Sequence, residues 1–348
     1  MSDRSGEPWH LQLGYYGYVA GSAAAGRLPE RQAYWVAHRL GELWARCATN
    51  RREVVAANLA RVTGEPPGSA RLEALTAEAF RSYARYWLEL FRLVREDKEF
   101  FLERFTCDGE EHLRSVLDRG AGALIVVGHL GNWDAAAGWV GASGRRLETV
   151  AEILRPRRLF EFFAAQRGRL GVVVHPAERR SAIKLVEALR RGSVVAILGD
   201  RDLRGDGPEI DFFGATTTLP GGPAAVALKA GVPILVAGVY GVQLPGGKRG
   251  WWAQISAPIE LPETHGEGAV AALTRSVAVE LERHIARAPE EWHVFRPFWP
   301  TAPSGLGRTK KMDGASRTVR ETGGLDRTAR WIRGGLDRTT GRTTGRIA

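Results

Sequence analysis

The chain has few of the residues that build disulfide frameworks or metal sites. Only two of its 348 residues are cysteine, Cys47 and Cys107, and they form no C-x-x-C pair. The eight histidines show neither H-x-x-x-H nor H-E-x-x-H spacing. We therefore expect no disulfide framework, no metal site and a reducing compartment.

Long apolar runs are also missing. The N-terminus, M-S-D-R-S-G-E-P, has no basic region followed by an apolar core, so we expect no secretory signal. No run approaches the roughly eighteen apolar residues that a membrane-spanning helix needs. If the protein acts at a membrane, we expect it to lie on the surface as a peripheral protein.

Basic charge is concentrated at the C-terminus. Hydrophobic residues make up 44% of the chain and charged residues 25%, an ordinary globular balance. Of the net charge of +10, residues 305–348 carry +7, from eleven Lys/Arg and four Asp/Glu. This segment repeats G-G-L-D-R-T and has little to bury, which predicts a disordered basic tail. It could attract anionic lipids or nucleic acid, or only keep the protein soluble.

Residues 1–304 are expected to form one α/β domain, with a helical part (1–106) and a sheet-containing part (107–304). Helices are predicted over residues 28–48, 51–62 and 72–94. Residues 9–26 form either a loosely packed helix or a segment whose tyrosines lie at a lipid interface. The helix over residues 72–94 has an apolar stripe of Tyr83, Tyr86, Trp87, Leu90 and Phe91. Such a stripe is usually core, although beside arginines it would also suit a phospholipid surface.

From residue 122 onward, short apolar runs alternate with helical patterns. The predicted strands are Leu124–Val127, Thr149–Leu154, Val172–Val174, Val194–Leu198, Ile234–Val239 and Trp251–Ser256. The predicted helices are Arg157–Arg169, Arg179–Arg191, Pro223–Ala230 and Gly268–Arg287. This alternation predicts an α/β fold with a mostly parallel central sheet flanked by helices on both faces. Ligands of such sheets bind beyond the carboxyl ends of the strands.

The strongest candidate site lies in residues 124–140, L-I-V-V-G-H-L-G-N-W-D-A-A-A-G-W-V. A buried strand is followed by an irregular link and then a helix, with His129 in the link and Asp134 at the start of the helix. On a continuous helix, residues five apart would point about 140° away from each other. Their meeting therefore depends on the irregular link, where Gly131 gives the backbone freedom.

A histidine held by a carboxylate is suited to general-base chemistry. The carboxylate fixes one imidazole nitrogen and makes the other a better base. We predict that His129, oriented by Asp134, deprotonates a hydroxyl that attacks a carbonyl, with backbone N–H groups of residues 128–131 as oxyanion donors. The alternative is that His129 only ends a strand and Asp134 is an ordinary first-turn acid favoured by the helix dipole.

Two further candidates lie near other element ends. Glu152 falls in the apolar strand T-V-A-E-I-L, where a carboxylate needs a function or a partner such as Arg155. Arg167 ends a helix, where it either complements the helix dipole or binds phosphate.

Three charged residues, Asp200, Arg201 and Asp202, directly follow the predicted strand Val194–Leu198. Charges at such a position cost free energy unless they are paired or used for binding, so we include all three as candidate substrate-binding residues. The chain contains neither G-x-x-x-x-G-K-[ST] nor G-x-G-x-x-G, the phosphate loops of many nucleotide-binding proteins.

The G-H-L-G-N-W-D sequence after a strand resembles the H-x-x-x-x-D/E motif of the glycerophosphate and lysophospholipid acyltransferase superfamily. It is most similar to the branch that contains the bacterial lipid A acyltransferases and the actinobacterial phosphatidylinositol mannoside acyltransferases. Further matches, in the same order, are V-A-E-I-L-R-P, Q-R-G-R-L-G, G-D-R-D-L, G-P-E-I-D-F-F-G, L-P-G-G-P-A and P-E-E-W-H-V-F-R-P-F-W. The resemblance covers about residues 28–300.

The resemblance implies an O-acyltransferase without a cofactor that acts at the cytoplasmic face of the cell membrane. Acyl-CoA would be the co-substrate, a palmitoyl-like chain the acyl group, and a mannose hydroxyl of phosphatidylinositol mannosides the acceptor. His129 matches the base of that family and Asp134 its partner, while Glu152, Arg167 and Asp200 match other active-site residues. The branch carries glutamate where this chain has Asp200, and the shorter side chain could shift the acceptor position.

Two alternatives stay open. One is the same acyl transfer to another acceptor, such as a lipid A-like sugar or a specialised metabolite. The other is a non-catalytic protein that binds lipid or nucleic acid. The nucleic-acid hypothesis rests on the basic tail alone, and the His129/Asp134 pattern counts against it, so no nucleic acid partner is expected.

Overall fold

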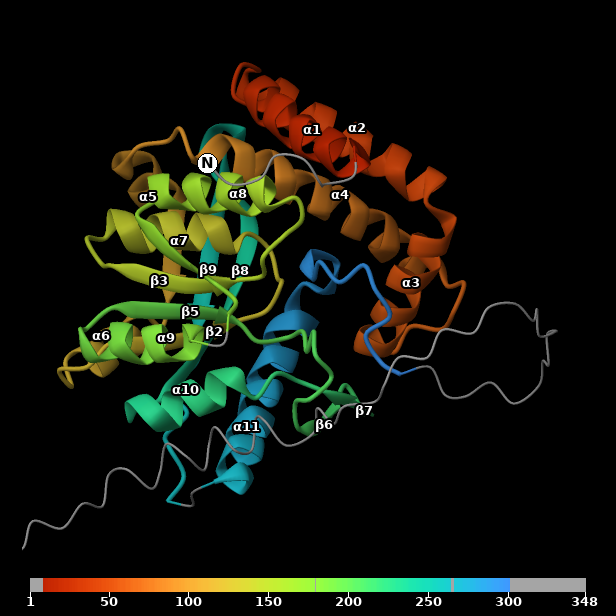
Figure 1. Ribbon diagram of the computed structural model, residues 1–348. Helices are drawn as coiled ribbons and strands as arrows, with labels where there is room; N and C mark the ends of the chain where they lie inside the picture. Colours follow the sequence, from red (N-terminus) through yellow and green to blue (C-terminus); the bar gives the residue numbers. More distant parts are fainter. Residues whose placement is uncertain (1–8, 179, 264–265, 301–348) are drawn as a thin grey trace, which may run out of the picture. The chain divides into compact units, whose positions relative to one another are not determined.

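The N-terminal third of the chain is helical, as its apolar periodicity predicts. The computed structural model describes residues 9–178, 180–263 and 266–300 (Figure 1), and the basic tail predicted over residues 305–348 lies outside them. The first helices are α1 (Trp9–Ala25), α2 (Glu30–Cys47), α3 (Thr49–Thr63), α4 (Ala70–Leu93) and α5 (Lys98–Arg104). Side-chain oxygens of Ser69 and Asp97 cap the starts of α4 and α5. The predicted helices are confirmed to within two residues.

The remaining elements alternate between strand and helix. The strands are β1 (Phe105–Asp108), β2 (Ala123–Val127), β3 (Leu147–Ala151), β4 (Val172–Pro176), β5 (Val194–Leu198), β6 (Glu209–Phe212), β7 (Ala215–Thr218), β8 (Ile234–Gln243) and β9 (Arg249–Ile255). The helices between them are α6 (Glu110–Leu117), α7 (Trp133–Ala142), α8 (Arg157–Arg169), α9 (Ser181–Arg190), α10 (Gly222–Ala230) and α11 (Glu267–Arg287), with short turns η1 (Pro245–Gly247) and η2 (Pro289–Glu291).

The central sheet has the order β1-β9-β8-β2-β5-β3-β4. Neighbouring strands are parallel except β8 and β9, so β9 and β1 run opposite to the other five. The predicted mostly parallel α/β fold is therefore confirmed. The sequence analysis missed β1 and the separate β6–β7 hairpin, and it placed the end of β3 three residues too late, because β3 pairs with β4 only as far as Ala151 and Pro176.

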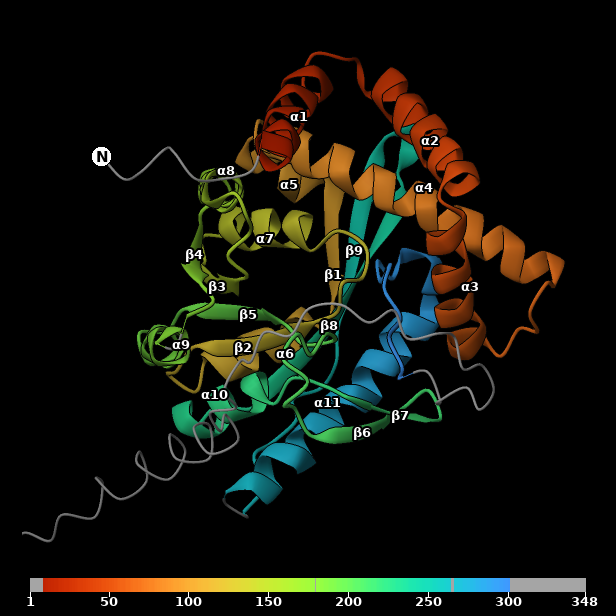
Figure 2. The same ribbon diagram turned by 45° about the vertical axis from the view of Figure 1, so that its right-hand side comes forward.

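Helices cover both faces of the sheet (Figures 1 and 2). Alternate residues of β2 point to opposite faces, as the twofold period of a strand requires. Leu124 and Val126 pack with α9, α10 and α11, whereas Ala123 and Ile125 pack with α5, α6 and α7. Burial on both faces explains why β2 and β5 read as continuous apolar runs.

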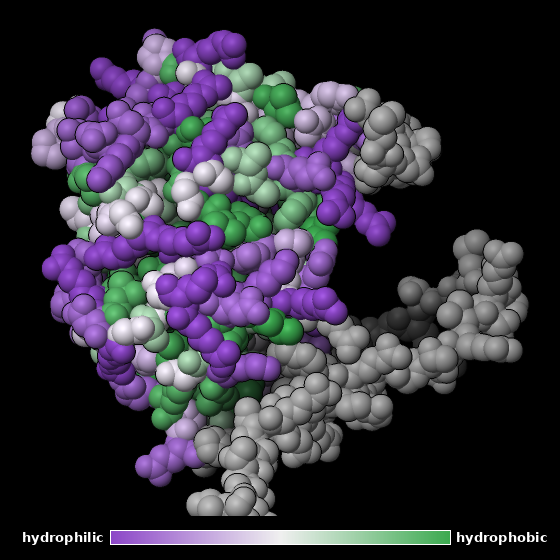
Figure 3. Space-filling view, turned by 60° about the vertical axis from the view of Figure 1, so that its left-hand side comes forward, coloured by the Kyte–Doolittle hydropathy of each residue, from purple (hydrophilic) through white to green (hydrophobic). Residues whose placement is uncertain are grey.

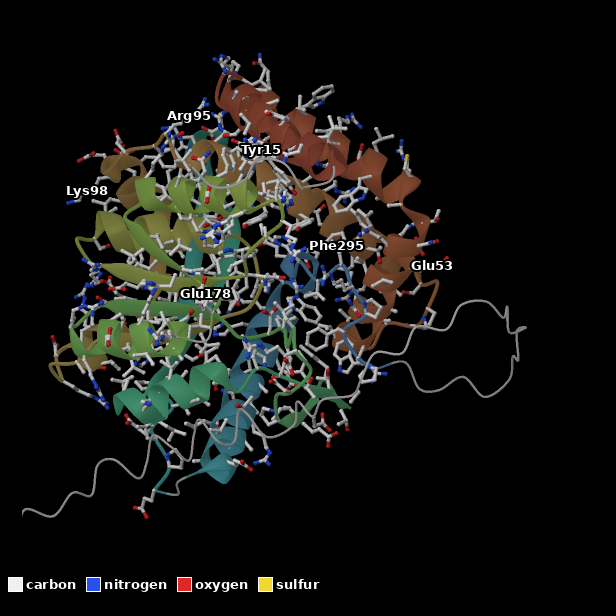
Figure 4. The ribbon with its side chains drawn as sticks, viewed as in Figure 1. Tyr15, Glu53, Arg95, Lys98, Glu178 and Phe295 are labelled. Carbon is white, nitrogen blue, oxygen red and sulfur yellow. The ribbon has the colours of Figure 1, made fainter. Side chains whose placement is uncertain are left out.

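The apolar stripe of α4 is mostly core. Tyr86, Leu90 and Phe91 are buried, and Leu90 is only 1% exposed. The segment after η2 covers part of the same helix: Phe295, labelled in Figure 4, stacks on Trp44 and packs against Tyr83. This packing holds the last described residues against α2 and α4.

No helix of the described residues is long and apolar enough to cross a membrane. The face shown in Figure 3 is mainly hydrophilic, with hydrophobic side chains in small groups between the charged ones. Larger exposed hydrophobic side chains occur on the two N-terminal helices: Leu13 and Tyr16 on α1, and Trp35, Leu40 and Leu43 on α2.

Candidate active site

His129 forms a hydrogen-bonded pair with Asp200. Nδ1 of His129 lies 2.7 Å from Oδ1 of Asp200, and the backbone N–H of His129 donates to Oδ2 at 2.9 Å. Because an ionised carboxylate only accepts, the imidazole proton lies on Nδ1, and Nε2 keeps its lone pair. The His129 side chain is 17% exposed while Asp200 is fully buried, so the base is accessible and its partner is shielded.

The sheet brings these two residues together although 71 positions separate them in the sequence. Strands β2 and β5 are adjacent and parallel, and Val127 pairs with Leu198 at their carboxyl ends. The N–H of Gly199 donates to the carbonyl of Val127 at 2.9 Å, which continues the pairing by one residue. The next position on each strand carries His129 and Asp200. The shorter side chain of Asp200 therefore suffices to reach the imidazole.

Asp200 is held as a carboxylate despite its burial. Burial alone would raise its pKa, but the charge of His129 and the hydrogen bonds from that residue and from Trp292 hold the pKa below its usual value. The indole Nε1–H of Trp292 donates to Oδ2 at 2.9 Å. The carboxylate is thus ready to stabilise an imidazolium on His129.

Asp134 was predicted as the partner of His129, and this pairing is wrong. Its Oδ1 accepts from Nε of Arg167 at 2.7 Å, and its Oδ2 accepts from Nη2 of Arg167 at 3.2 Å and from the Tyr86 hydroxyl at 3.0 Å. Asp134 is 1% exposed, and it faces α4 and α8 from the first turn of α7. The irregular link turns His129 toward β5 and leaves Asp134 on the other side. Burial opposes the charge of Arg167, but Asp134 raises the pKa of that guanidinium.

The link between His129 and α7 is fixed by buried polar contacts. The side chain of Asn132 caps α7 by accepting from Ala135 N–H, and its amide donates to Glu89 at 2.6 Å. Gly131 has a φ of +59°, and a Cβ there would collide with the carbonyl oxygen of Val239. The link therefore uses the backbone conformation that glycine permits, as predicted, and the turn is also packed too tightly for a side chain at this position.

The link does not offer two of the predicted oxyanion donors. The N–H of His129 is bonded to Asp200, and the N–H of Gly131 donates to the carbonyl of Glu291 at 2.9 Å. These two groups cannot stabilise a developing oxyanion without first breaking those bonds.

Glu152 lies outside the strand in which it was predicted. It follows the last residue of β3, and its side chain is exposed. Within the described residues its carboxylate makes no hydrogen bond or ion pair, so the expected internal partner Arg155 is not engaged. The prediction that Glu152 lies inside an apolar strand was therefore wrong, but its place in the sheet still bears on the site. Strand β3 neighbours β5, so Glu152 lies at the same edge of the sheet as Asp200.

The side chains of Asp202 and Arg201 differ in their hydrogen bonds. The carboxylate of Asp202 accepts from the backbone N–H groups of Arg204, Gly205 and Gly207 at 2.8 to 3.1 Å. Burial would raise the pKa of Asp202, but these backbone bonds lower it. Asp202 therefore stabilises its own loop, whereas the half-buried Arg201 makes no hydrogen bond to the described residues.

Trp292 and His293 were not among the candidate residues predicted from the sequence, but both contact the site. The backbone around Trp292 forms an antiparallel bridge with Leu130. The N–H of His293 donates to the carbonyl of His129 at 2.7 Å. The only sequence signal for this segment was its match to the P-E-E-W-H-V-F-R-P-F-W motif.

A small polar pocket lies behind the link and is lined in part by Ser82, Arg85, Glu291 and His293. Nε2 of His293 lies 3.0 Å from the Ser82 hydroxyl, while Nδ1 of His293 and Nε of Arg85 have no hydrogen-bond partner among the described residues. Burial, followed by the nearby charges of Arg85 and His129, lowers the pKa of His293 to about 3. Burial raises the pKa of Glu291 to about 7, against the N–H of Gly241 and the charge of Arg249.

Together these groups form a site for general-base chemistry. A buried carboxylate fixes the Nδ1–H tautomer of His129, and Nε2 can accept a proton. Within the described part of the chain, neither serine nor cysteine hydrogen-bonds to His129, so an external hydroxyl is the simplest nucleophile. The fold and site define an α/β protein with an accessible histidine beyond a strand end, in the protonation pattern that suits a general base.

Comparison with known proteins gives the family. The model of the bacterial lipid A biosynthesis acyltransferases matches residues 6–301. The chain therefore belongs to this family and is an acyltransferase of lipid biosynthesis. The resemblance noted in the sequence motifs is confirmed.

The names of individual relatives are more specific than the family description. A phosphatidylinositol mannoside acyltransferase of Mycolicibacterium smegmatis is 34% identical over 286 residues, which cover 81% of this chain and 90% of the relative. Enzymes of the same name from two strains of Mycobacterium tuberculosis are 36% identical over 247 residues, or 70% of this chain and 75% of theirs. Among solved structures, the 1-acyl-sn-glycerophosphate acyltransferase of Thermotoga maritima is 14% identical with a TM-score of 0.33, over 66% of this chain and 95% of that one.

Proposed function

We propose that the protein transfers a long, palmitoyl-like acyl chain from acyl-CoA to a mannose hydroxyl of a phosphatidylinositol mannoside. The observation that carries this proposal is the His129–Asp200 pair, a general base in an acyltransferase whose curated relatives are named for that acceptor. The same relatives support a glycolipid as the acceptor class. No cofactor takes part in the proposed reaction.

The proposed reaction is a direct acyl transfer. Nε2 of His129 takes the proton of the sugar hydroxyl while its oxygen attacks the thioester carbonyl. The new C–O bond forms, the C–S bond breaks, and CoA leaves as a thiolate that receives a proton from the imidazolium. Asp200 stabilises the imidazolium during this step, because its ionised carboxylate lies 2.7 Å from Nδ1.

Three further residues are suited to hold the substrates. Arg167 is fixed by two hydrogen bonds to Asp134 yet remains 19% exposed, so its outer face can meet a hydroxyl or a phosphate. Arg201 offers uncommitted donors for phosphate. Glu152 is exposed at the same edge of the sheet, where its carboxylate can accept from sugar hydroxyls.

We place the reaction at the cytoplasmic face of the cell membrane, with the protein bound peripherally. Support comes from the exposed side chains of α1 and α2, among them Leu13, Tyr16 and Trp35, which is 61% exposed. Arg39 lies over the Trp35 ring at 5.7 Å, so an aromatic residue and a cation share one face of α2. Such a combination favours an anionic lipid interface.

The test is release of free CoA from palmitoyl-CoA by the purified protein, with and without phosphatidylinositol mannosides. We expect acceptor-dependent release that falls by about 10²- to 10⁴-fold in His129→Ala. His38→Ala, which removes a surface histidine paired with Glu42, is the matched control and should leave turnover unchanged.

Other outcomes separate the alternatives. Hydrolysis that depends on His129 but not on mannosides would keep acyl transfer and point to another acceptor, which the shorter Asp200 makes the leading alternative. Near wild-type turnover in folded His129→Ala would overturn the proposed mechanism. Lipid binding without any turnover would indicate a non-catalytic protein.

A further inference from the structure

We infer that Trp292 is a positioning residue of the acyl transfer: its indole N–H fixes the Asp200 carboxylate that orients His129. The inference rests on the proposed role of the His129–Asp200 pair. It assigns a chemical role to a residue that was not predicted as part of the site.

The hydrogen bonds of Asp200 show why a third group is needed. Oδ1 accepts from the His129 ring, and Oδ2 accepts from the His129 backbone and from Trp292. Both other donors belong to His129 itself, so they cannot fix the carboxylate relative to the rest of the protein if the link moves. Trp292 comes from a different segment and supplies the independent contact. Asp200 has no exposed surface, so solvent cannot replace a lost donor without rearrangement.

The indole is itself held rigidly. Trp292 is 3% exposed, and its ring packs against Phe298 at 4.9 Å and Trp299 at 6.2 Å between centroids. Its backbone segment is joined to the link on both sides, by the bonds from His293 to His129 and from Gly131 to Glu291. The ring, the link and the carboxylate therefore form one closed set of contacts, which ties the tautomer of His129 to the C-terminal segment.

Loss of the indole N–H should change the pKa of Asp200 in a defined direction. With one hydrogen-bond donor fewer, the Asp200 carboxylate is less stabilised and its pKa rises. Its negative charge then interacts more strongly with His129. The imidazolium form of His129 is then stabilised relative to the neutral imidazole. Both changes move the acidic limb of the activity profile to higher pH, because the reaction needs a neutral imidazole beside an ionised carboxylate.

Other titratable groups near the pair must be separated from this effect. His293 on the same segment has its pKa lowered to about 3, and burial raises the pKa of Tyr86 on α4, so both stay neutral across the working range. Asp134 raises the pKa of Arg167 on α8, so that guanidinium stays charged. Glu291, with a pKa raised to about 7, is the described neighbour that titrates in this range, so Glu291→Gln serves as a separate control.

The experiment compares Trp292→Phe with Trp299→Phe. Both variants keep an aromatic ring in the same cluster and remove one indole N–H, but the N–H of Trp299 donates to the carbonyl of Phe212 at 3.0 Å. We expect Trp292→Phe to lower kcat about tenfold to a hundredfold, with little change in KM, and to move the acidic limb upward by about half a pH unit or more. Trp299→Phe should do neither, and Glu291→Gln should not reproduce the loss in kcat.

Equal effects of the two tryptophan variants, or an unmoved acidic limb in folded Trp292→Phe, would reduce Trp292 to a packing residue. A second measurement uses only the wild-type protein, so it needs no substrate and does not depend on whether a variant folds. In the wild-type protein, the indole Nε1–H resonance of Trp292 should shift with pH together with the ring signals of His129, whereas that of Trp299 should not. If the wild type transfers no acyl group, the proposed function fails, and this titration still decides the role of Trp292.

Discussion

Two buried aspartates are found at the six-residue segment from His129 to Asp134, and they have different partners: Asp200 contacts the first residue of the segment, and Asp134 is its last residue. Asp200 meets His129, whose charge can change, and Asp134 meets Arg167, whose charge cannot. The first pair can therefore take part in proton transfer, while the second can only hold a guanidinium in place. The motif acid nearest in sequence therefore holds Arg167, and the carboxylate partner of His129 comes from the end of the neighbouring strand.

The sharpest way to test this division is Asp200→Asn. The two donors at Oδ2 would keep the amide oxygen on their side and turn the amide N–H groups toward His129. Nδ1 would then accept, and the proton would move to Nε2, which can no longer act as a base. We expect kcat to fall by about 10²- to 10⁴-fold, measured as CoA release. Asp134→Asn, which leaves the tautomer intact, should keep the wild-type acidic limb; a loss of that limb would contradict the division of roles.

Replacing Arg167 removes the Asp134–Arg167 ion pair. Arg167→Met leaves Asp134 buried with only the Tyr86 hydroxyl, and an uncompensated buried carboxylate should cost about 3 kcal/mol of unfolding free energy. Urea unfolding measures this change. Arg169→Met, an exposed arginine on the same helix, is the control and should stay within about 0.5 kcal/mol of the wild type. Adding Asp134→Asn to Arg167→Met should restore part of the loss, and no restoration would argue against the pair.

Glu291 and His293, which flank Trp292, oppose each other in their effect on stability. The folded protein holds the proton of Glu291 up to a pKa of about 7 instead of 4.5, so this group makes stability fall as pH rises between those values. The pKa of His293 is about 3 instead of 6.5, so the unfolded chain binds the extra proton and stability rises with pH over that range. Between about pH 4.5 and 6.5 the two effects largely cancel.

Glu291→Gln should unmask the His293 effect. We expect the unfolding free energy of this variant to rise by up to about 1.4 kcal/mol per pH unit from pH 4.5 to 6.5, against a flatter wild-type profile. Urea titrations at three pH values in this interval measure the slope. Identical slopes in the two proteins would mean that the pocket does not hold these protonation states.

The fold was largely predictable from the sequence, and the pairing of the site residues was not. Strands such as Val194–Leu198 are continuous apolar runs, so their existence follows from composition. Strand β1, F-T-C-D, was missed because four residues give too short a pattern, and only its pairing with β9 makes it a strand. The edge of the sheet that carries the candidate residues was also predictable, because polar residues follow several strand ends.

What the sequence could not provide was the order of the strands. His129 and Asp134 are close in the chain, so they were the natural pair, but β2 lies beside β5, and this adjacency is a property of the folded sheet. Trp292 was harder to find, because its indole reaches Asp200 from a segment that follows the last helix. The contacts that decide which carboxylate serves the base are therefore all long-range.

The smallest effect expected on stability concerns Glu152, a carboxylate at this edge that is exposed and bonded to none of the described residues. Because its side chain is exposed and bonded to none of the described residues, Glu152→Gln should change the unfolding free energy by no more than about 0.5 kcal/mol. If it binds the acceptor, KM for the glycolipid should rise several-fold while kcat and KM for acyl-CoA stay close to wild type. Glu178→Gln is the matched control, since Glu178 is exposed beyond the end of β4 (Figure 4). A KM unchanged in both variants would leave Glu152 without a role in acceptor binding, and the edge of the sheet would then serve catalysis through the His129–Asp200 pair alone.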